Sequence, residues 1–137
     1  MIIDATDTVL GRLATYVAKK SLLGESIEVI NSEKAIVTGN KKDILAKYLH
    51  RLQRGSPRWG PFVYRKEDMF VRRTIRGMLP FKQPKGRDAY KRIRCYLGVP
   101  ENLKNEKIMK LSEFSISKLT NLKYSYVSDI CKALGRK

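Results

Sequence analysis

The arginines of this chain are concentrated in one internal stretch, and their side chains are suited to binding phosphate. Residues 50–94 contain ten arginines and four lysines, whereas the rest of the chain contains two arginines and thirteen lysines. A guanidinium group offers a planar fork of donors that fits a phosphate and a flat face that stacks on a base, and lysine has neither. The reversed ratio of arginine to lysine therefore predicts that residues 50–94 contact RNA.

The positive charge of the chain is gathered in the same stretch. Of the net charge of +16, residues 50–94 contribute +11, residues 1–49 contribute +1 and residues 95–137 contribute +4. Such an excess destabilises a compact chain by self-repulsion unless a polyanion neutralises it. The sequence has no lipidation motif that would favour a membrane, so the expected partner is nucleic acid.

Aromatic side chains interrupt the basic stretch. The alternative to a binding face is a solvated basic surface or a disordered tail, but this stretch is internal and such a tail would lack aromatic residues. Trp59, Tyr64 and Phe81 are candidates for stacking on unpaired bases. Each is equally suited to a core, and for Trp59, which stands between Arg58 and Gly60, the two interpretations carry equal weight.

The sequence contains no recognisable catalytic constellation. The phosphate-loop pattern and the glycine pattern of dinucleotide-binding folds are both absent. Residues 38–43 (TGNKKD) follow a strand and open a helix, so their N–H groups either bind an RNA phosphate or, as we favour, begin an ordinary capped helix. Asp4 and Asp7 are expected at a strand end and at a helix cap, not as a catalytic pair. Neither a cofactor nor a small-molecule substrate is predicted.

The cysteines and the single histidine argue against a metal site. Cys95 and Cys131 fit no metal-binding spacing, and in a cytosolic protein both are expected to be reduced, with a disulfide between them as the alternative. His50 falls on the basic side of its helix, where solvent or phosphate is its expected contact. The sequence has no run of apolar residues long enough for a membrane helix, and its start resembles neither a signal nor a transit peptide. The chain is therefore expected in the cytoplasm.

The hydrophobic pattern of the first part of the chain predicts a βαβ unit. Residues 1–5 and 26–31 are typical of short strands, and residues 9–23 have the apolar periodicity of a helix, capped by Asp7 or Thr8. Two parallel strands joined by a helix indicate a layered α/β domain.

Further elements are expected downstream of this unit. They are a strand at 35–38, a helix capped by Asn40 and ending near residue 54, a basic loop at 54–62, a helix at 66–79 stopped by Pro80, a short helix within 81–94, a last core strand at 95–100, and a helix at about 124–134 that begins with Tyr124. We expect a single domain over residues 1–137, with a core of about 1–100 and a C-terminal extension of about 101–137.

Several short motifs occur in an order and spacing that match a known family. They are GRLA at 11–14, TGN at 38–40, GP at 60–61, RGMLP at 76–80, the stretch from Lys82 to Gly86, and YLGVP at 96–100. Over roughly residues 2–103 the chain resembles ribosomal protein thirteen of the large subunit, in its archaeal or eukaryotic form. VRRTIRGMLP is the most specific part of the match, and residues 104–137 carry no matching motif.

The resemblance implies a three-layer α/β/α fold with a small, mostly parallel four-stranded sheet, basic loops and a C-terminal helical extension. It implies a structural constituent of the large ribosomal subunit, without enzymatic activity, that binds rRNA beside neighbouring ribosomal proteins and takes part in assembly. Matched motif by motif, the expected RNA-facing residues are Arg12, Arg65, Arg72, Arg73, Arg76, Lys82, Lys85 and Arg87. The basic stretch itself adds Arg51, Arg54, Arg58, Trp59 and Arg92.

The chain departs from the family pattern at two places in the basic stretch. Lys66 and Glu67 stand where relatives commonly have Ala-Pro, and Phe81 stands where histidine is usual. These departures affect the detailed contacts of residues 64–82 and not the family assignment.

Three kinds of function are candidates for this sequence. The favoured one is a structural ribosomal protein. A free-standing regulator that binds RNA or DNA would share the charge pattern but would bind short isolated targets. An RNA-modifying enzyme would need a pocket with a cofactor loop or paired catalytic groups, which the sequence does not contain.

Overall fold

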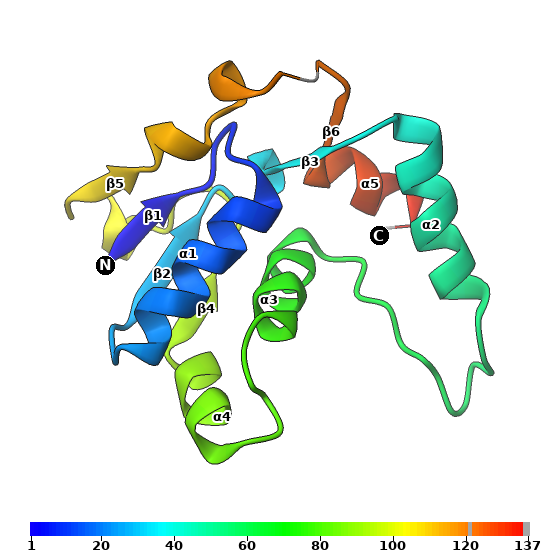
Figure 1. Cartoon of the computed structure of the whole chain (residues 1–137), viewed down its shortest axis with the longest axis horizontal. Helices are drawn as coiled ribbons and strands as arrows, with labels where there is room; N and C mark the ends of the chain where they lie inside the picture. Colours follow the sequence, from blue (N-terminus) through cyan, green and yellow to red (C-terminus); the bar gives the residue numbers. More distant parts are fainter. Residues whose placement is uncertain (121, 136–137) are drawn as a thin grey trace.

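A four-stranded parallel sheet forms one side of the molecule, and helix α1 (Leu10–Leu22) lies across it (Figure 1). The structure is a computed structural model that describes residues 1–120 and 122–135. The strands are β1 (Ile2–Asp4), β2 (Ile27–Ile30), β4 (Ile93–Cys95) and β5 (Ile108–Lys110), in the order β4-β2-β1-β5. Every neighbouring pair runs parallel, which confirms the predicted α/β class with a small parallel sheet.

The first two strands and the helix between them form the predicted βαβ unit. Helix α1 (Leu10–Leu22) buries Leu13, Ala14 and Val17 completely. The predicted side-chain cap is wrong, because Val9 occupies the N-cap position and no capping hydrogen bond is made there. Packing of the apolar face therefore fixes the start of this helix, without help from a cap.

The third predicted strand lies outside the main sheet. Strand β3 (Ile36–Thr38) pairs antiparallel with β6 (Tyr124–Tyr126) in a separate two-stranded sheet. The 3₁₀ turn η1 (Ser32–Lys34) and the left-handed backbone of Asn31, with a φ of +54°, turn the chain away after β2. The sequence predicted that Tyr124 belongs to the last helix, but Tyr124 is a strand residue.

The predicted strand at 95–100 is also wrong in its bounds. Strand β4 ends at Cys95, and the residues after it bond to the turn that follows β2. The Asn31 N–H donates to the Gly98 carbonyl at 2.9 Å, and the Ser32 N–H donates to the Tyr96 carbonyl at 3.1 Å. The remaining place in the parallel sheet is taken by β5, in a segment where the sequence predicted no strand.

Apolar residues alternate between the two faces of the sheet. Ile3, Ile27 and Val29 belong to the main core, which also contains buried residues of α1, α3 (Glu67–Gly77), α4 (Pro84–Lys91) and α5 (Val127–Ala133). Ile2 and Ile30 form a smaller cluster with Leu103 on the other face. Leu103 comes from the 3₁₀ turn η2 (Glu101–Leu103), so the second layer over the sheet is thin.

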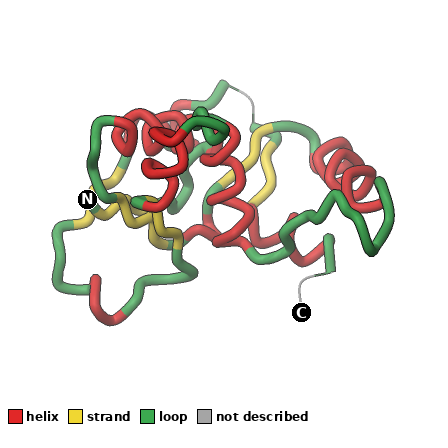
Figure 2. The backbone as a smooth tube through the Cα atoms, turned by 90° about the horizontal axis from the view of Figure 1, so that it is seen from below, coloured by secondary structure: helices red, strands yellow, loops and turns green. Residues whose placement is uncertain are grey.

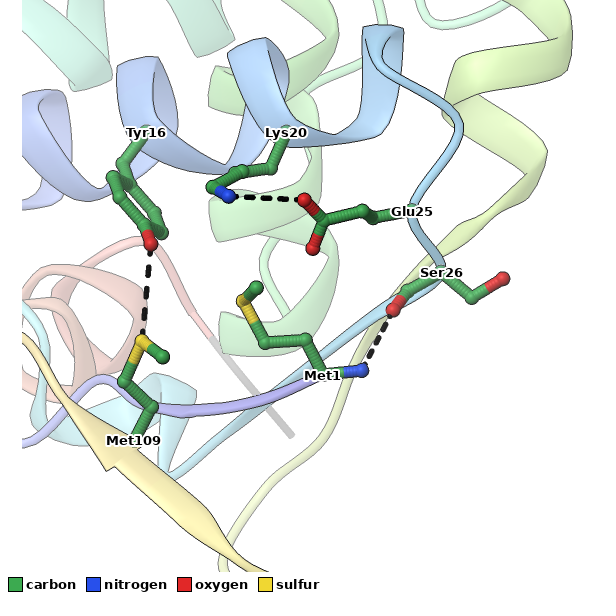
Figure 3. Close-up of polar contacts among 6 residues, drawn as sticks. All are labelled: Met1, Tyr16, Lys20, Glu25, Ser26 and Met109. Atoms are coloured by element: carbon green, nitrogen blue, oxygen red, sulfur yellow. Dashed lines mark hydrogen bonds and ion pairs between the residues drawn. The ribbon is translucent and has the colours of Figure 1, made fainter.

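Close contacts tie strands β1 and β5 to their neighbours (Figure 3). The ammonium group of Met1 donates to the Ser26 carbonyl at 2.9 Å, just before β2. The Tyr16 hydroxyl on α1 donates to the Met109 sulfur on β5 at 3.8 Å. These contacts, with the parallel pairing of β1 and β5, make the segment around residue 109 part of the sheet.

Helix α2 (Lys41–Gln53) stands at one end of the molecule (Figures 1 and 2). Asn40 occupies the predicted N-cap position, but its side chain makes no capping hydrogen bond, and Ile44 is the buried residue of the helix. The loop of residues 54–66 leads from α2 back to α3. Among the helices that the structure describes, none has the length and apolar character of a membrane span.

Candidate nucleic-acid interface

Helix α3 presents three arginines outside the core. Val71 and Ile75 are fully buried on its inner face. Arg73 is exposed, and Arg72 and Arg76 are half-buried. This division follows from the 3.6-residue period, because the arginine positions fall on the side away from Val71 and Ile75.

Two of these arginines are stacked on aromatic rings. The guanidinium carbon of Arg72 lies 4.5 Å from the centre of the Tyr90 ring, and that of Arg76 lies 4.0 Å from the centre of the Phe81 ring. The two rings pack edge to face with their centres 5.4 Å apart. A guanidinium that stacks through its flat face keeps its in-plane N–H groups available for an anion. The ring pair therefore holds two guanidinium groups about one helical turn apart.

A tight turn after α3 places Phe81 beside the helix. Pro80 cannot continue the helix, and the Gln83 N–H donates to the Pro80 carbonyl at 2.9 Å. In the first turns of α4, Gly86 approaches this turn so closely that a Cβ would overlap the Pro80 carbonyl oxygen. Glycine at position 86 thus lets α4, which carries Tyr90, pack against the turn that carries Phe81.

The described arginines around α3 form no ion pair with a described carboxylate. All ion pairs between described residues use lysine as the cation, so no described arginine lies within 4.0 Å of a described carboxylate. Lys82, Lys85 and Arg87 are exposed at the start of α4 and extend the positive surface. An arginine without a carboxylate partner keeps its charge and its donors for an external anion.

A second group of basic residues lies on α2 and the loop that follows it. The Arg51 guanidinium carbon lies 5.6 Å from the centre of the Tyr48 ring on the same helix. Arg73 of α3 lines the same groove as Arg51, and its guanidinium carbon lies 6.0 Å from the centre of the Tyr64 ring. This groove of about 470 Å³ separates the two helices, and Arg54 also lines it.

Trp59 is a surface residue of the loop after α2. Its side chain is 81% exposed, which excludes the core interpretation that the sequence left open. Backbone hydrogen bonds between Ser56 and Gly60, of 2.8 and 3.2 Å, close a tight turn around it. The Arg58 guanidinium carbon lies 5.5 Å from the centre of the indole. The loop thus displays an arginine and a large aromatic ring together.

Three further arginines predicted to bind RNA have other surroundings. Arg12 is exposed in the first turn of α1. Nη1 of Arg65 donates to the Gly135 carbonyl at 3.5 Å, just after α5. Arg92 is half-buried, and its Nη2 donates to the Ser21 carbonyl at 3.2 Å near the C-terminus of α1, where a cation is favourable. Arg92 is therefore engaged within the fold.

Asp4 and Asp7 make separate structural contacts. Asp4 accepts hydrogen bonds from the Thr6 hydroxyl at 2.7 Å and from the Asn31 amide at 2.9 Å. Burial raises the pKa of Asp4, but the hydrogen bonds from Thr6 and Asn31 outweigh it and hold the pKa below its ordinary value. Asp7 accepts from the Tyr126 hydroxyl at 3.1 Å, which links the loop after β1 to β6.

The two cysteines are free thiols, so the alternative of a disulfide between Cys95 and Cys131 is wrong. Burial raises the pKa of Cys95 to about 12, an effect that Arg72 opposes and Asp68 reinforces. A thiol with such a pKa stays protonated at neutral pH and is a poor nucleophile. Among the described residues, no group of histidine, cysteine and acidic side chains is placed to hold a metal ion, and His50 is exposed.

Comparison with known families shows which family the chain belongs to. The family model for ribosomal protein L13 matches residues 1–102, which include the sheet strands β1, β2 and β4 and helix α3. The chain belongs to the ribosomal protein L13 family. Membership confirms the resemblance drawn from the motifs, and it places the chain among ribosomal proteins and not among enzymes.

Archaeal relatives extend the similarity over nearly the whole chain. A large ribosomal subunit protein uL13 from Methanopyrus kandleri is 46% identical over 136 residues, which cover 98% of this chain and 86% of the relative. The protein of the same name from Methanocaldococcus jannaschii is 43% identical over 140 residues, covering 99% and 98%. That from Archaeoglobus fulgidus is 40% identical over 135 residues, covering 98% and 86%. The similarity thus reaches β5, β6 and α5, for which the motifs gave no match.

Sequence reasoning missed two aromatic residues that support the arginines of this L13 family member. Tyr48 precedes Arg51 by three positions on one helix, and this spacing places both on one face, so the signal was present in the sequence. Tyr90 meets Arg72 from another helix, and only the packing of α4 on α3 reveals the contact.

Proposed function

We propose that this chain, as a structural protein of the large ribosomal subunit, binds large-subunit rRNA through α3 and the start of α4. The observation that carries the proposal is the pair of stacked arginines, Arg72 and Arg76, with no described carboxylate within ion-pair distance. Aromatic rings hold their guanidinium groups in place, so less side-chain freedom is lost when a phosphate binds. The other residues of this surface are Arg73, Lys82, Lys85 and Arg87.

The mechanism is neutralisation of RNA phosphates by a rigid protein body. RNA segments that approach one another repel through their backbones, and arginines fixed on one α/β unit offset that repulsion at defined places. Contacts of this kind position the RNA and carry little sequence information. If roughly eight phosphates are neutralised, the affinity falls with salt at a log–log slope of about −6 to −7.

The remaining predicted residues lie outside this surface of α3 and α4. Arg51, Arg54, Arg58 and Trp59 contact a second RNA segment at the α2 end of the molecule, and Arg12 and Arg65 act at the periphery. Arg92 is assigned to the fold, because its guanidinium bonds to the Ser21 carbonyl. Residues 1–137 act as one domain within the cytoplasmic ribosome, beside neighbouring ribosomal proteins.

The test replaces Arg72, Arg73 and Arg76 together by alanine and measures binding to transcribed large-subunit rRNA as a function of salt. The triple variant is expected to lose affinity at physiological salt and to lower the magnitude of the log–log slope by about 2 to 3, since three phosphate contacts disappear. Circular dichroism should show an intact fold, because these side chains lie outside the core.

The matched control removes the same charge elsewhere. Lys19, Lys107 and Lys118 are exposed and lie outside the proposed surface, and their joint replacement by alanine should leave the slope nearly unchanged. Unchanged affinity of the arginine variant at physiological salt would overturn the proposal. An equal loss of affinity in both variants would show that binding depends on the total charge of the chain and not on this surface.

A further inference from the structure

The groove between α2 and α3 has the character of a binding site that the fold itself leaves open. Its aromatic walls are Tyr48, Phe62, Tyr64 and Phe70. Phe70 is buried, and the centre of its ring lies 4.9 Å from that of Tyr48. Phe62 and Tyr64 remain 69% and 45% exposed on the loop. Exposed aromatic rings around a hollow mark a surface that a partner covers.

The cations of the groove are all arginines. Arg51 and Arg54 line it from the end of α2, and Arg73 lines it from α3. No acidic side chain is among its described lining residues. Its volume of about 470 Å³ falls within the roughly 300–1,000 Å³ that suits a ligand of small-molecule size. The groove therefore fits one flat ring together with negatively charged groups attached next to that ring.

We propose that this groove takes one unpaired RNA base, stacked among its aromatic rings, with the adjoining phosphates on Arg51, Arg54 and Arg73. This inference rests on the proposed rRNA-binding function and assigns a nucleotide site to one part of that surface. Unpaired bases present flat faces that stack on tyrosine and phenylalanine, and the flanking phosphates suit the arginine forks.

The position of the groove favours RNA over a protein partner. Arg73 borders the groove, while Arg72 and Arg76 of the same helix stack on the rings around α4. An RNA strand that meets the α3 surface therefore continues into the groove without crossing a carboxylate among its lining residues. A peptide would need an aromatic side chain for the rings of the groove and acidic side chains spaced to reach its arginines.

The test uses two five-unit RNA probes that differ by one base. One probe has a single adenine at its centre and abasic ribose at the other positions, and the second is abasic throughout, so that both carry the same phosphates. Fluorescence anisotropy should show that the central adenine raises affinity by roughly 5- to 150-fold, the range expected for one base–aromatic stack. The Phe62→Ala/Tyr64→Ala double variant should bind both probes equally.

Two further variants give the result its meaning. The Leu23→Ala/Leu97→Ala variant removes two exposed apolar side chains that lie outside both the groove and the proposed RNA-binding residues, and it should keep the gain from adenine. The Arg72→Ala/Arg76→Ala variant should weaken binding to large-subunit rRNA and also keep the gain, so failure of the proposed function and failure of this site are distinguishable.

Three outcomes would overturn the assignment. Equal affinity of the wild-type chain for both probes, including no binding of either, would exclude a base site. Persistence of the adenine gain in the Phe62→Ala/Tyr64→Ala variant would place the stack elsewhere. Tighter binding of a glutamate-rich peptide with a central tyrosine than of the adenine probe, lost in the same double variant, would assign the groove to a protein partner.

Discussion

The guanidinium carbon of Arg76 lies 4.0 Å from the centre of the Phe81 ring, so a residue of the turn after α3 orients an arginine of the helix itself. Phe81 in turn packs edge to face on Tyr90, whose ring lies against Arg72. The two arginines and the two rings form one connected cluster across α3, the turn and α4. Its packing fixes where two positive charges stand, and this has consequences that can be measured.

Replacing Phe81 by leucine should weaken rRNA binding. Leucine keeps the apolar character of the side chain but has no π face, so the Arg76 guanidinium loses its support. A cation–π contact of this kind contributes about 0.5–1 kcal/mol at an exposed site, which corresponds to roughly a 2- to 5-fold loss of affinity. Filter binding at fixed salt measures the loss.

Phe114→Leu is the control for this experiment. Phe114 also packs against an aromatic ring, that of Tyr16, at a centre-to-centre distance of 6.1 Å, but no described guanidinium lies over it. Its replacement should leave RNA affinity unchanged. If the two variants bound RNA equally well, the stacking of Arg76 on Phe81 would have no part in recognition.

Replacing Gly86 by alanine should destabilise the protein. The added Cβ would overlap the Pro80 carbonyl oxygen, so α4 must move away from the turn. Overpacking of this kind costs about 1–3 kcal/mol, and chemical denaturation should show a lower free energy of unfolding by that amount. Gly11→Ala in α1 is the control, because nothing lies within 4 Å of the added Cβ and alanine favours the helix. A Gly86→Ala variant as stable as Gly11→Ala would contradict the close approach.

Replacing Arg92 by glutamine should lower stability and leave rRNA affinity within about twofold. The change removes the hydrogen bond of 3.2 Å to the Ser21 carbonyl and a cation near the C-terminus of α1. These two losses amount to about 1–2 kcal/mol, or a decrease in Tm of roughly 3–8 °C. Arg94→Gln makes the same charge change at an exposed position of β4 and should keep the Tm. A large loss of RNA affinity with an unchanged Tm would return Arg92 to the RNA-binding surface.

Replacing Asp4 by asparagine should lower stability at neutral pH, and the difference should disappear in acid. The fold lowers the pKa of Asp4 from its ordinary value of 3.8, so the ionised carboxylate favours the folded state. This contribution, about 1 kcal/mol, is fully present above that ordinary value and is lost as the pH falls through the lower folded pKa. Denaturation curves at pH 7 and pH 3 for both proteins measure the difference.

Glu106→Gln provides the comparison for the Asp4 variant. Glu106 is exposed, and its replacement removes one negative charge without the buried hydrogen bonds that Asp4 accepts from Thr6 and Asn31. Its stability should follow that of the wild-type chain at both pH values. A difference between wild type and Asp4→Asn that stayed constant down to pH 3 would show that ionisation of Asp4 does not contribute.

The sequence by itself determined the elements that rest on strong local patterns. The βαβ unit, α2 and α3 follow from apolar periodicity, and their observed bounds lie within a few residues of the predicted ones. The concentration of arginine over residues 50–94 likewise predicted which part of the chain displays positive charge. The motifs from GRLA to YLGVP identified the family, because they depend on residue identity and order and not on folding.

Only the tertiary structure decided which segments meet. Strand β5 is three residues long, and all three belong to the exposed residues of the chain. Its sequence therefore shows no alternation of apolar and polar residues, and its pairing with β1 defines it. Strand β3 leaves the main sheet because Asn31 turns the backbone and β6 offers it a partner from the end of the chain. Tertiary packing also gives the arginines different surroundings. Aromatic rings of the turn and of α4 hold Arg72 and Arg76 in place, whereas Arg92 donates to a carbonyl near the end of α1. Arginine type predicts an affinity for phosphate, but the neighbours that packing brings to each guanidinium decide whether it serves the fold or an external anion.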